Sequence, residues 1–130
     1  MQEWKIKAIE ILPEIKTEIL DSDEPMQLWL EIVYYFDMAY EEEPRNESFI
    51  KRVYDYQDWC LEQDEEGKTA AEHLPTCVIT CFWEHIPTKP FARQDMPNWF
   101  TLEDVLANQH FFRYSLSDEN FKELIDLYTR

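Results

Sequence analysis

Residues 25–42, PMQLWLEIVYYFDMAYEE, place apolar side chains on nearly every side of a helix. Pro25 suits the first turn of a helix, where its missing N–H costs little, so a helix is expected from about Met26 to Glu42. A helix that is apolar nearly all round is packed on several sides. We therefore expect this segment to lie at the centre of its domain.

The segments on both sides of this helix also repeat with a period near 3.6 residues, which is typical of helices. The chain has 1 Gly, Gly67, so it lacks the usual residue of tight hairpin turns. Before the central helix, a helix is expected over Glu3–Leu12, continuing to Leu20 after a break at Pro13. After it, helices are expected from a cap at Asn46 or Ser48 to Leu61, and over Leu74–Ile86 with Pro75 in the first turn. Two C-terminal helices are expected to begin at a capping box, Thr101–Asp104, and at a cap, Ser117. The fold class is expected to be all-α: a single compact bundle of about five to seven helices, forming one acidic domain over residues 1–130.

The segment Pro87–Phe100 is expected to be a proline-rich loop, or a set of short turns, before the C-terminal helices. Two interpretations of it remain open. Lys89 and Arg93 could make it a recognition loop, because long loops in small domains are often functional. Alternatively, Phe91, Trp99 and Phe100 close the open end of the bundle, and the prolines stiffen the route.

The charge of the chain is strongly negative, with 12 Lys+Arg against 28 Asp+Glu and a formal net charge of -16. Because 15% of the residues are aromatic, the chain can nevertheless bury a core. One Gly allows no glycine-rich phosphate-binding loop. Nucleic acid is not an expected partner, because its affinity for proteins comes largely from Lys and Arg.

The chain has no apolar run long enough to span a membrane, and its first residues lack the charged-then-apolar layout of a signal peptide. We therefore expect a cytoplasmic protein that has no membrane contact. The 3 cysteines, Cys60, Cys77 and Cys81, lie in apolar helical patterns and are expected to be reduced. No cofactor is expected.

The acidic residues are concentrated between positions 25 and 66. Two clusters lie there, Glu41, Glu42 and Glu43 after the central helix, and Asp64, Glu65 and Glu66 after the next one. If the two helices are antiparallel, these clusters lie at opposite ends of the pair. Such clusters are either solvated surface or a docking face for a basic protein.

Metal and acid–base chemistry have weaker candidates. His73, Cys77, Cys81 and His85 recur every fourth residue, but at 1.5 Å per residue they span about 18 Å of helix, too far to hold one ion. No metal site is therefore expected. Asp37 and Glu84 lie among apolar residues and are expected to be partly buried with raised pKa values. They could act as general acids or could only organise the core. Together with His85 they are the buried polar residues that are candidates for a functional site.

The order Leu12-Pro13-Glu14, acidic turn, aromatic-rich helix, amphipathic helix, acidic turn and Phe82-Trp83-Glu84 resembles a family of small acidic all-α bacterial domains of unknown function. Some members of that family resemble immunity proteins of toxin systems. The resemblance covers Leu12 to Ile86, and Phe82 with Glu84 matches the most recognisable element. It implies a helical fold and no assigned activity.

These observations favour a non-enzymatic protein-binding domain over an enzyme. Its partner is expected to be a basic protein, such as a toxin, held by Glu41–Glu43 and Asp64–Glu66 with neighbouring aromatic residues. The alternative is a small-molecule or metal site in the bundle interior around Glu84 and His85, with Asp37 and the cysteines nearby.

Overall fold

The computed structural model describes residues 1–63 and 68–129, and this part of the chain is all-helical, with no strand. Helices make up 74% of the structure, which confirms the expected all-α class. The described residues form nine α-helices: α1 Glu3–Ile11, α2 Lys16–Asp21, α3 Pro25–Glu41, α4 Glu47–Leu61, α5 Leu74–Cys77, α6 Pro90–Asp95, α7 Leu102–Ala107, α8 Gln109–Phe112 and α9 Asp118–Leu127. This number exceeds the five to seven expected, because the chain after α5 is divided into short helices.

The chain divides into two compact units, Met1–Cys81 and Phe82–Arg130. The assignment of residues 1–130 to one domain stays a prediction. None of the helices in the described ranges combines the length and the apolar character that crossing a membrane requires.

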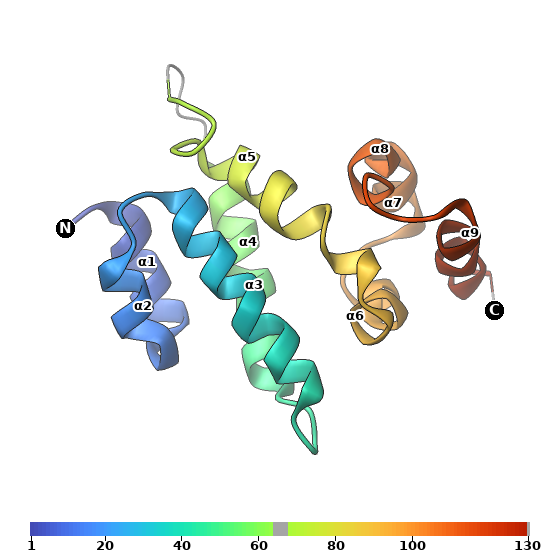
Figure 1. Cartoon of the computed structure of the whole chain (residues 1–130), viewed down its shortest axis with the longest axis horizontal. Coiled ribbons are helices and arrows are strands. Elements are labelled where there is room, and N and C mark those ends of the chain that lie inside the picture. The colour runs from blue at the N-terminus through green and yellow to red at the C-terminus, as the bar shows by residue number, and fades with distance from the viewer. Residues whose placement is uncertain (64–67, 130) are drawn as a thin grey trace. The chain divides into compact units, whose positions relative to one another are not determined.

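In the first unit, α2, α4 and α5 lie beside α3 (Figure 1). Helix α1 packs against α2 and α4. Helix α3 and helix α4 run antiparallel, so their connection lies at one end of the pair. The buried side of α3 is formed by large apolar side chains, including the fully buried Leu28, Trp29, Ile32 and Phe36.

Local signals in the sequence set the ends of these helices. Pro13 interrupts the first helical segment and opens a short 3₁₀ turn, Pro13–Ile15, before α2. Pro25 lies in the first turn of α3, as expected. Asn46 caps α4, because its side chain accepts a hydrogen bond from the backbone N–H of Phe49 at 3.1 Å.

The expected helix Leu74–Ile86 is present in a modified form. Helix α5 is followed by a π-helical segment, Val78–Trp83, whose turns are wider than those of an α-helix. His73 lies before α5 as its N-cap and accepts a hydrogen bond from the N–H of Thr76 through Nδ1.

In the second unit, the segment expected to be a proline-rich loop or a set of short turns contains short turns and also an α-helix. Residues 86–98 are mostly helical, as the 3₁₀ turn Ile86–Thr88, helix α6 and the 3₁₀ turn Met96–Asn98. Each begins with a proline in its first two positions, where the missing N–H leaves no helical bond unmade. The prolines therefore start helices in this segment.

The aromatic residues of this segment do not act together. Phe100 is buried and its ring centroid lies 5.2 Å from that of Phe112. Trp99 is half-buried and donates from Nε1 to Asp95 at 3.0 Å. Phe91 is 58% exposed, so it does not share in the closing contact that one interpretation of the segment expected of all three aromatic residues.

Arg93 is buried instead of being displayed for recognition. Its Nη1 donates to the carbonyl oxygen of Pro87 at 2.8 Å, and its Nη2 lies 3.3 Å from an Oε1 of Glu123. A buried guanidinium needs such partners, because an unpaired charge in the interior is costly. Arg93 therefore joins the start of this segment to α9, and only Lys89 of the two expected basic residues is exposed.

The two expected caps of the C-terminal helices are confirmed. Thr101 and Asp104 form a reciprocal capping box at the start of α7. Ser117 caps α9 by accepting a hydrogen bond from the N–H of Asn120 at 3.1 Å.

Two leucines on α3 provide a test of which side of this helix stabilises the fold. Leu28 is fully buried and Leu30 is 60% exposed. We expect Leu28→Ala to lower the free energy of unfolding by about 2–5 kcal/mol, since it removes buried methyl groups and leaves a cavity. Leu30→Ala, the matched control, should change it by no more than about 0.5 kcal/mol. Urea denaturation followed by far-UV circular dichroism measures both, and equal effects would contradict the orientation of α3.

Candidate functional site

The first unit contains a pocket of about 230 Å³ beside the C-terminal half of α3. Its apolar lining comes from the 3₁₀ turn, α3 and α4: Ile15, Met38, Ala39 and Phe49. Its polar lining comes from the same region of the chain: Glu14, Tyr35, Glu42 and Asn46. The pocket thus combines an apolar wall with two carboxylates.

The pocket forms where two breaks in the helical pattern meet. The turn that begins at Pro13 contributes Glu14 and Ile15 to the pocket lining, and Asn46 starts α4 directly after the acidic connection. The backbone N–H of Asn46 donates to the carbonyl oxygen of Ala39 at 2.9 Å, which fixes this connection against α3.

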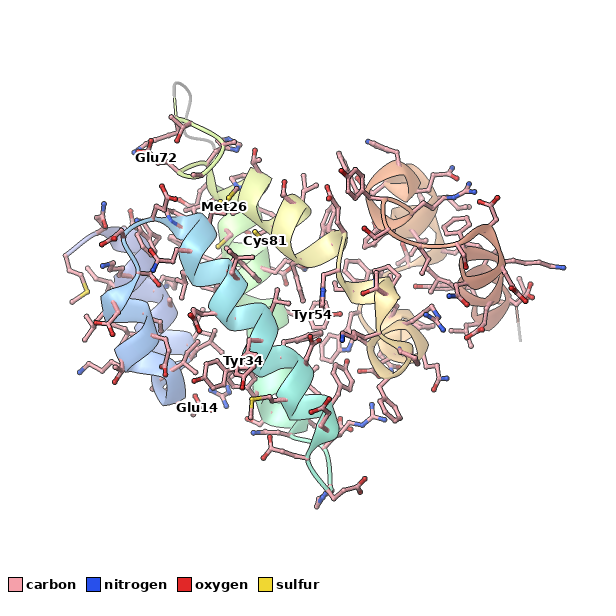
Figure 2. All side chains as sticks on the ribbon, viewed as in Figure 1. Glu14, Met26, Tyr34, Tyr54, Glu72 and Cys81 are labelled. Carbon is pink, nitrogen blue, oxygen red and sulfur yellow. The ribbon has the colours of Figure 1, made fainter. Side chains whose placement is uncertain are left out.

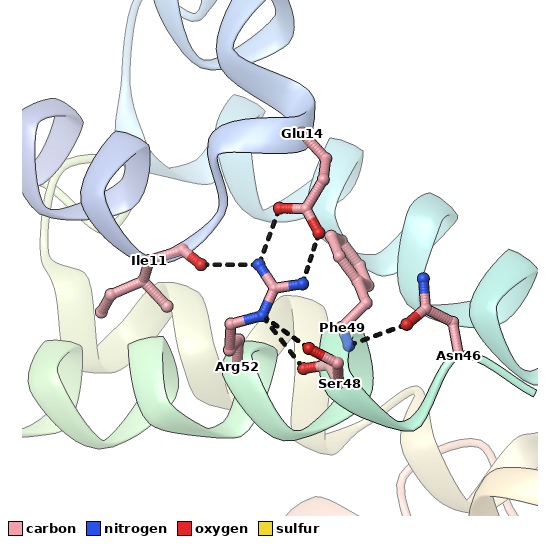
Figure 3. Close-up of polar contacts among 6 residues, drawn as sticks. All are labelled: Ile11, Glu14, Asn46, Ser48, Phe49 and Arg52. Carbon is pink, nitrogen blue, oxygen red and sulfur yellow. Dashed lines mark hydrogen bonds and ion pairs between the residues drawn. The ribbon is translucent and has the colours of Figure 1, made fainter.

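Arg52 of α4 holds one wall of the pocket in place (Figure 3). Its Nη1 donates to Glu14 Oε1 at 2.7 Å and to the carbonyl oxygen of Ile11 at 3.0 Å, and its Nη2 pairs with Glu14 Oε2. Its Nε donates to the carbonyl oxygen of Ser48 at 3.2 Å. The two-pronged pair lowers the pKa of Glu14 and raises that of Arg52, because each charge stabilises the other. Glu14 is therefore ionised and fixed.

Tyr35 forms the side of the pocket nearest α2. Its hydroxyl donates to Glu18 Oε1 at 3.0 Å, which raises the pKa of Tyr35 because the bond favours the protonated phenol. The bond joins α2 to α3, and the phenol oxygen keeps its capacity to accept a hydrogen bond.

Glu42 is the carboxylate of the predicted cluster Glu41–Glu43 that lines the pocket. All three side chains are exposed, and within residues 1–63 and 68–129 none of them makes an ion pair. The nearby cation Arg45 lies 4.0 Å from Glu47 and over the ring of Tyr40. The second predicted cluster, Asp64, Glu65 and Glu66, lies outside the described residues.

The other predicted polar residues lie away from this pocket's lining. Asp37 is half-buried on α3 in the first unit, and Glu84 and His85 are half-buried in the second. Burial raises the pKa of Glu84, as expected. In the described part of the chain no three His, Cys, Asp or Glu side chains are grouped so that they could hold a metal ion. The small-molecule alternative around Glu84 and His85 stays a prediction.

Sequence reasoning missed Glu14, Tyr35 and Arg52 as site residues. Glu14 and Arg52 are 38 positions apart, and no helical period connects residues so distant in the chain. Tyr35 belongs to the apolar pattern of residues 25–42, and that pattern does not distinguish its hydroxyl group. The available signal was the break at Pro13, because it marks where the chain must turn back toward the central helix.

Comparison of the chain with protein-family models, curated proteins and solved structures found no match. The function is therefore argued from the chemistry of the pocket and its surroundings.

The pair of Glu14 and Arg52 should make stability depend on pH. Because the folded-state pKa of Glu14 lies below its ordinary value of 4.5, the contribution is complete above that value and is lost as the pH falls through the folded-state pKa. We expect Glu14→Gln to cost about 1 kcal/mol or less near neutral pH, since the pair is partly exposed, and to cost almost nothing well below about pH 4.

Urea denaturation of both proteins at several pH values measures this difference. Glu43→Gln is the matched control, because Glu43 is exposed and has no ion pair among the residues described. A cost of Glu14→Gln that stays constant into the acidic range would contradict the pairing.

Cys77 should be chemically inert while the protein is folded. Burial raises its pKa to about 12, and its Sγ lies 3.5 Å from the carbonyl oxygens of Ala70 and Ala71. Since the thiolate is the reactive form, alkylation of Cys77 by iodoacetamide should be about 100-fold slower or more in the folded chain than in urea. Peptide mass spectrometry identifies the modified residue, and similar rates in both states would overturn the expectation.

Proposed function

We propose that this chain is a binding protein that takes a basic side chain of a partner protein into the pocket between Glu14 and Glu42. The proposal depends on one observation: an apolar wall and two carboxylates occur together in one cavity. Lysine and arginine side chains match this combination, because each has an apolar stem that carries a charged head. Their stems would lie against Met38, Ala39 and Phe49, with the charged head at the carboxylates.

The size of the pocket favours a single side chain over a free organic ligand. Pockets for drug-sized molecules have about 300–1,000 Å³, and this one has about 230 Å³. A carboxylate that already accepts two bonds from Arg52 still has free lone pairs. Glu14 can therefore receive a second cation without releasing the first.

The end of α3 adds to the attraction. The 17 residues of this helix end at Glu41, and the partial negative charge of a helix C-terminus favours a cation nearby. The net charge of -16 extends this preference over a longer distance and speeds the encounter with a basic surface. Both effects weaken with salt.

A finer part of the proposal concerns the kind of partner. The resemblance of Leu12–Ile86 to immunity-type bacterial domains supports an inhibitor that binds a toxin in the cytoplasm. A basic surface on the toxin would meet Glu41–Glu43, and binding without catalysis would be sufficient to block it. The cluster Asp64–Glu66, which lies outside the described residues, belongs to this proposal as a second acidic stretch of the sequence.

The pocket can be tested with two small probes that differ only in charge. We expect acetyl-arginine methylamide to shift the backbone amide signals of Ala39, Asn46 and Phe49 in isotopically labelled protein. The citrulline analogue, which has nearly the same shape without the charge, should bind more weakly. Glu42→Gln should weaken binding of the arginine probe by about two- to fivefold, the range for an exposed ion pair.

Glu119→Gln is the control, because Glu119 is also exposed and lies on α9 in the second unit. It should leave binding of the arginine probe unchanged. Equal binding of the two probes, or an unchanged affinity in Glu42→Gln, would overturn the proposal.

A further inference from the structure

Helix α3 leaves a row of large apolar side chains uncovered. Leu30, Tyr34 and Met38 expose 60%, 59% and 43% of their surface. They recur every fourth residue, so they lie along one side of the helix and span about 12 Å. Tyr34 is labelled in Figure 2, and its ring packs edge-on against that of Tyr35 at 5.2 Å.

This row is continuous with the pocket. Met38 is at once the last member of the row and part of the pocket lining, and Tyr35, which contacts Tyr34, lines the pocket as well. Single exposed apolar residues are ordinary on protein surfaces, but a row of three that ends in a pocket is typical of a binding surface.

The charged residues that α3 itself contributes are all negative. Helix α3 contains Glu31, Asp37 and Glu41 and no Lys or Arg. Glu31 and Glu41 are exposed, and on a helical projection they lie on the same side as Leu30 and Tyr34. An occupant of this surface must therefore be apolar along its centre and basic at its margins.

We propose that the row Leu30–Tyr34–Met38 is the docking surface for a basic amphipathic helix of the partner protein. This inference rests on the proposed function and extends it from one side chain to a segment. Apolar residues of the partner helix, one turn apart, would pack against the row, as in other helix-in-groove complexes. A Lys or Arg near the end of that helix would enter the pocket beside Met38.

Other occupants fit less well. A strand would need free backbone N–H and C=O groups, and those along the middle of α3 are bonded within the helix. A second copy of this chain would bring the same acidic residues to the surface, and like charges repel. The charge and the spacing together thus select a basic helix.

The test uses two synthetic peptides of about 15 residues with the same leucine and lysine content. In one peptide the leucines form a single helical stripe, and in the other their order is scrambled. We expect the striped peptide to bind more tightly and to shift the amide signals of α3. The double variant Leu30→Ala/Tyr34→Ala should weaken its binding about fivefold or more, because aromatic and apolar anchors carry most of the affinity of interfaces.

The matched control is Leu106→Ala/Tyr114→Ala. Both of these residues are exposed, by 43% and 74%, and they belong to the second unit. This control should leave peptide binding unchanged. Far-UV circular dichroism should show that both double variants keep their helical content, since all four side chains are at the surface.

The outcomes separate this inference from the pocket proposal. If acetyl-arginine methylamide binds but the striped and scrambled peptides bind equally, the docking surface is overturned and the pocket stands. If the striped peptide binds and depends on Leu30 and Tyr34 while the arginine probe does not bind, the docking surface stands and the pocket is overturned. Self-association of the chain in sedimentation, lost in Leu30→Ala/Tyr34→Ala, would show that a second copy is the occupant and would overturn the inference.

Discussion

The burial of α3 is the constraint on which the first unit depends. Leu28, Trp29, Ile32 and Phe36 are fully buried, and helices α2, α4 and α5 pack against this helix. Each buried apolar side chain of this size contributes about 1.5–3 kcal/mol, so no arrangement that exposes them competes. The ends of the neighbouring helices, and the pocket that those ends form, follow from covering this one helix.

The sequence was sufficient to predict where most helices of the first unit lie. Prolines at positions 13 and 25 and the cap at Asn46 mark helix boundaries by local chemistry, which needs no knowledge of the rest of the chain. The prolines of Pro87–Phe100 indicate a loop or short turns by themselves, but a proline is also well suited to the first turn of a helix, which is where these prolines lie. For the same reason, the number of helices predicted from the sequence was too low.

The site was less predictable than the fold. Exposed carboxylates such as Glu42 can be identified from charge alone, but the pairing of Glu14 with Arg52 depends on how three helical segments pack. The apolar pattern of α3 was also misleading in one respect. It indicated burial nearly all round, yet Leu30, Tyr34 and Met38 are exposed, and only the packing of the neighbours decides which apolar side chains stay uncovered.

Charge alone would be weak evidence for binding. An exposed carboxylate loses part of its hydration when it pairs, so the net gain of a surface ion pair is only about 0–1 kcal/mol. The apolar wall of the pocket and the row on α3 change that balance, because burying their surface contributes about 25 cal/mol per Å² whether or not a charge is present. Affinity would then come mainly from the apolar contacts, while Glu42 and its neighbours would set the rate of encounter and the orientation of a basic partner.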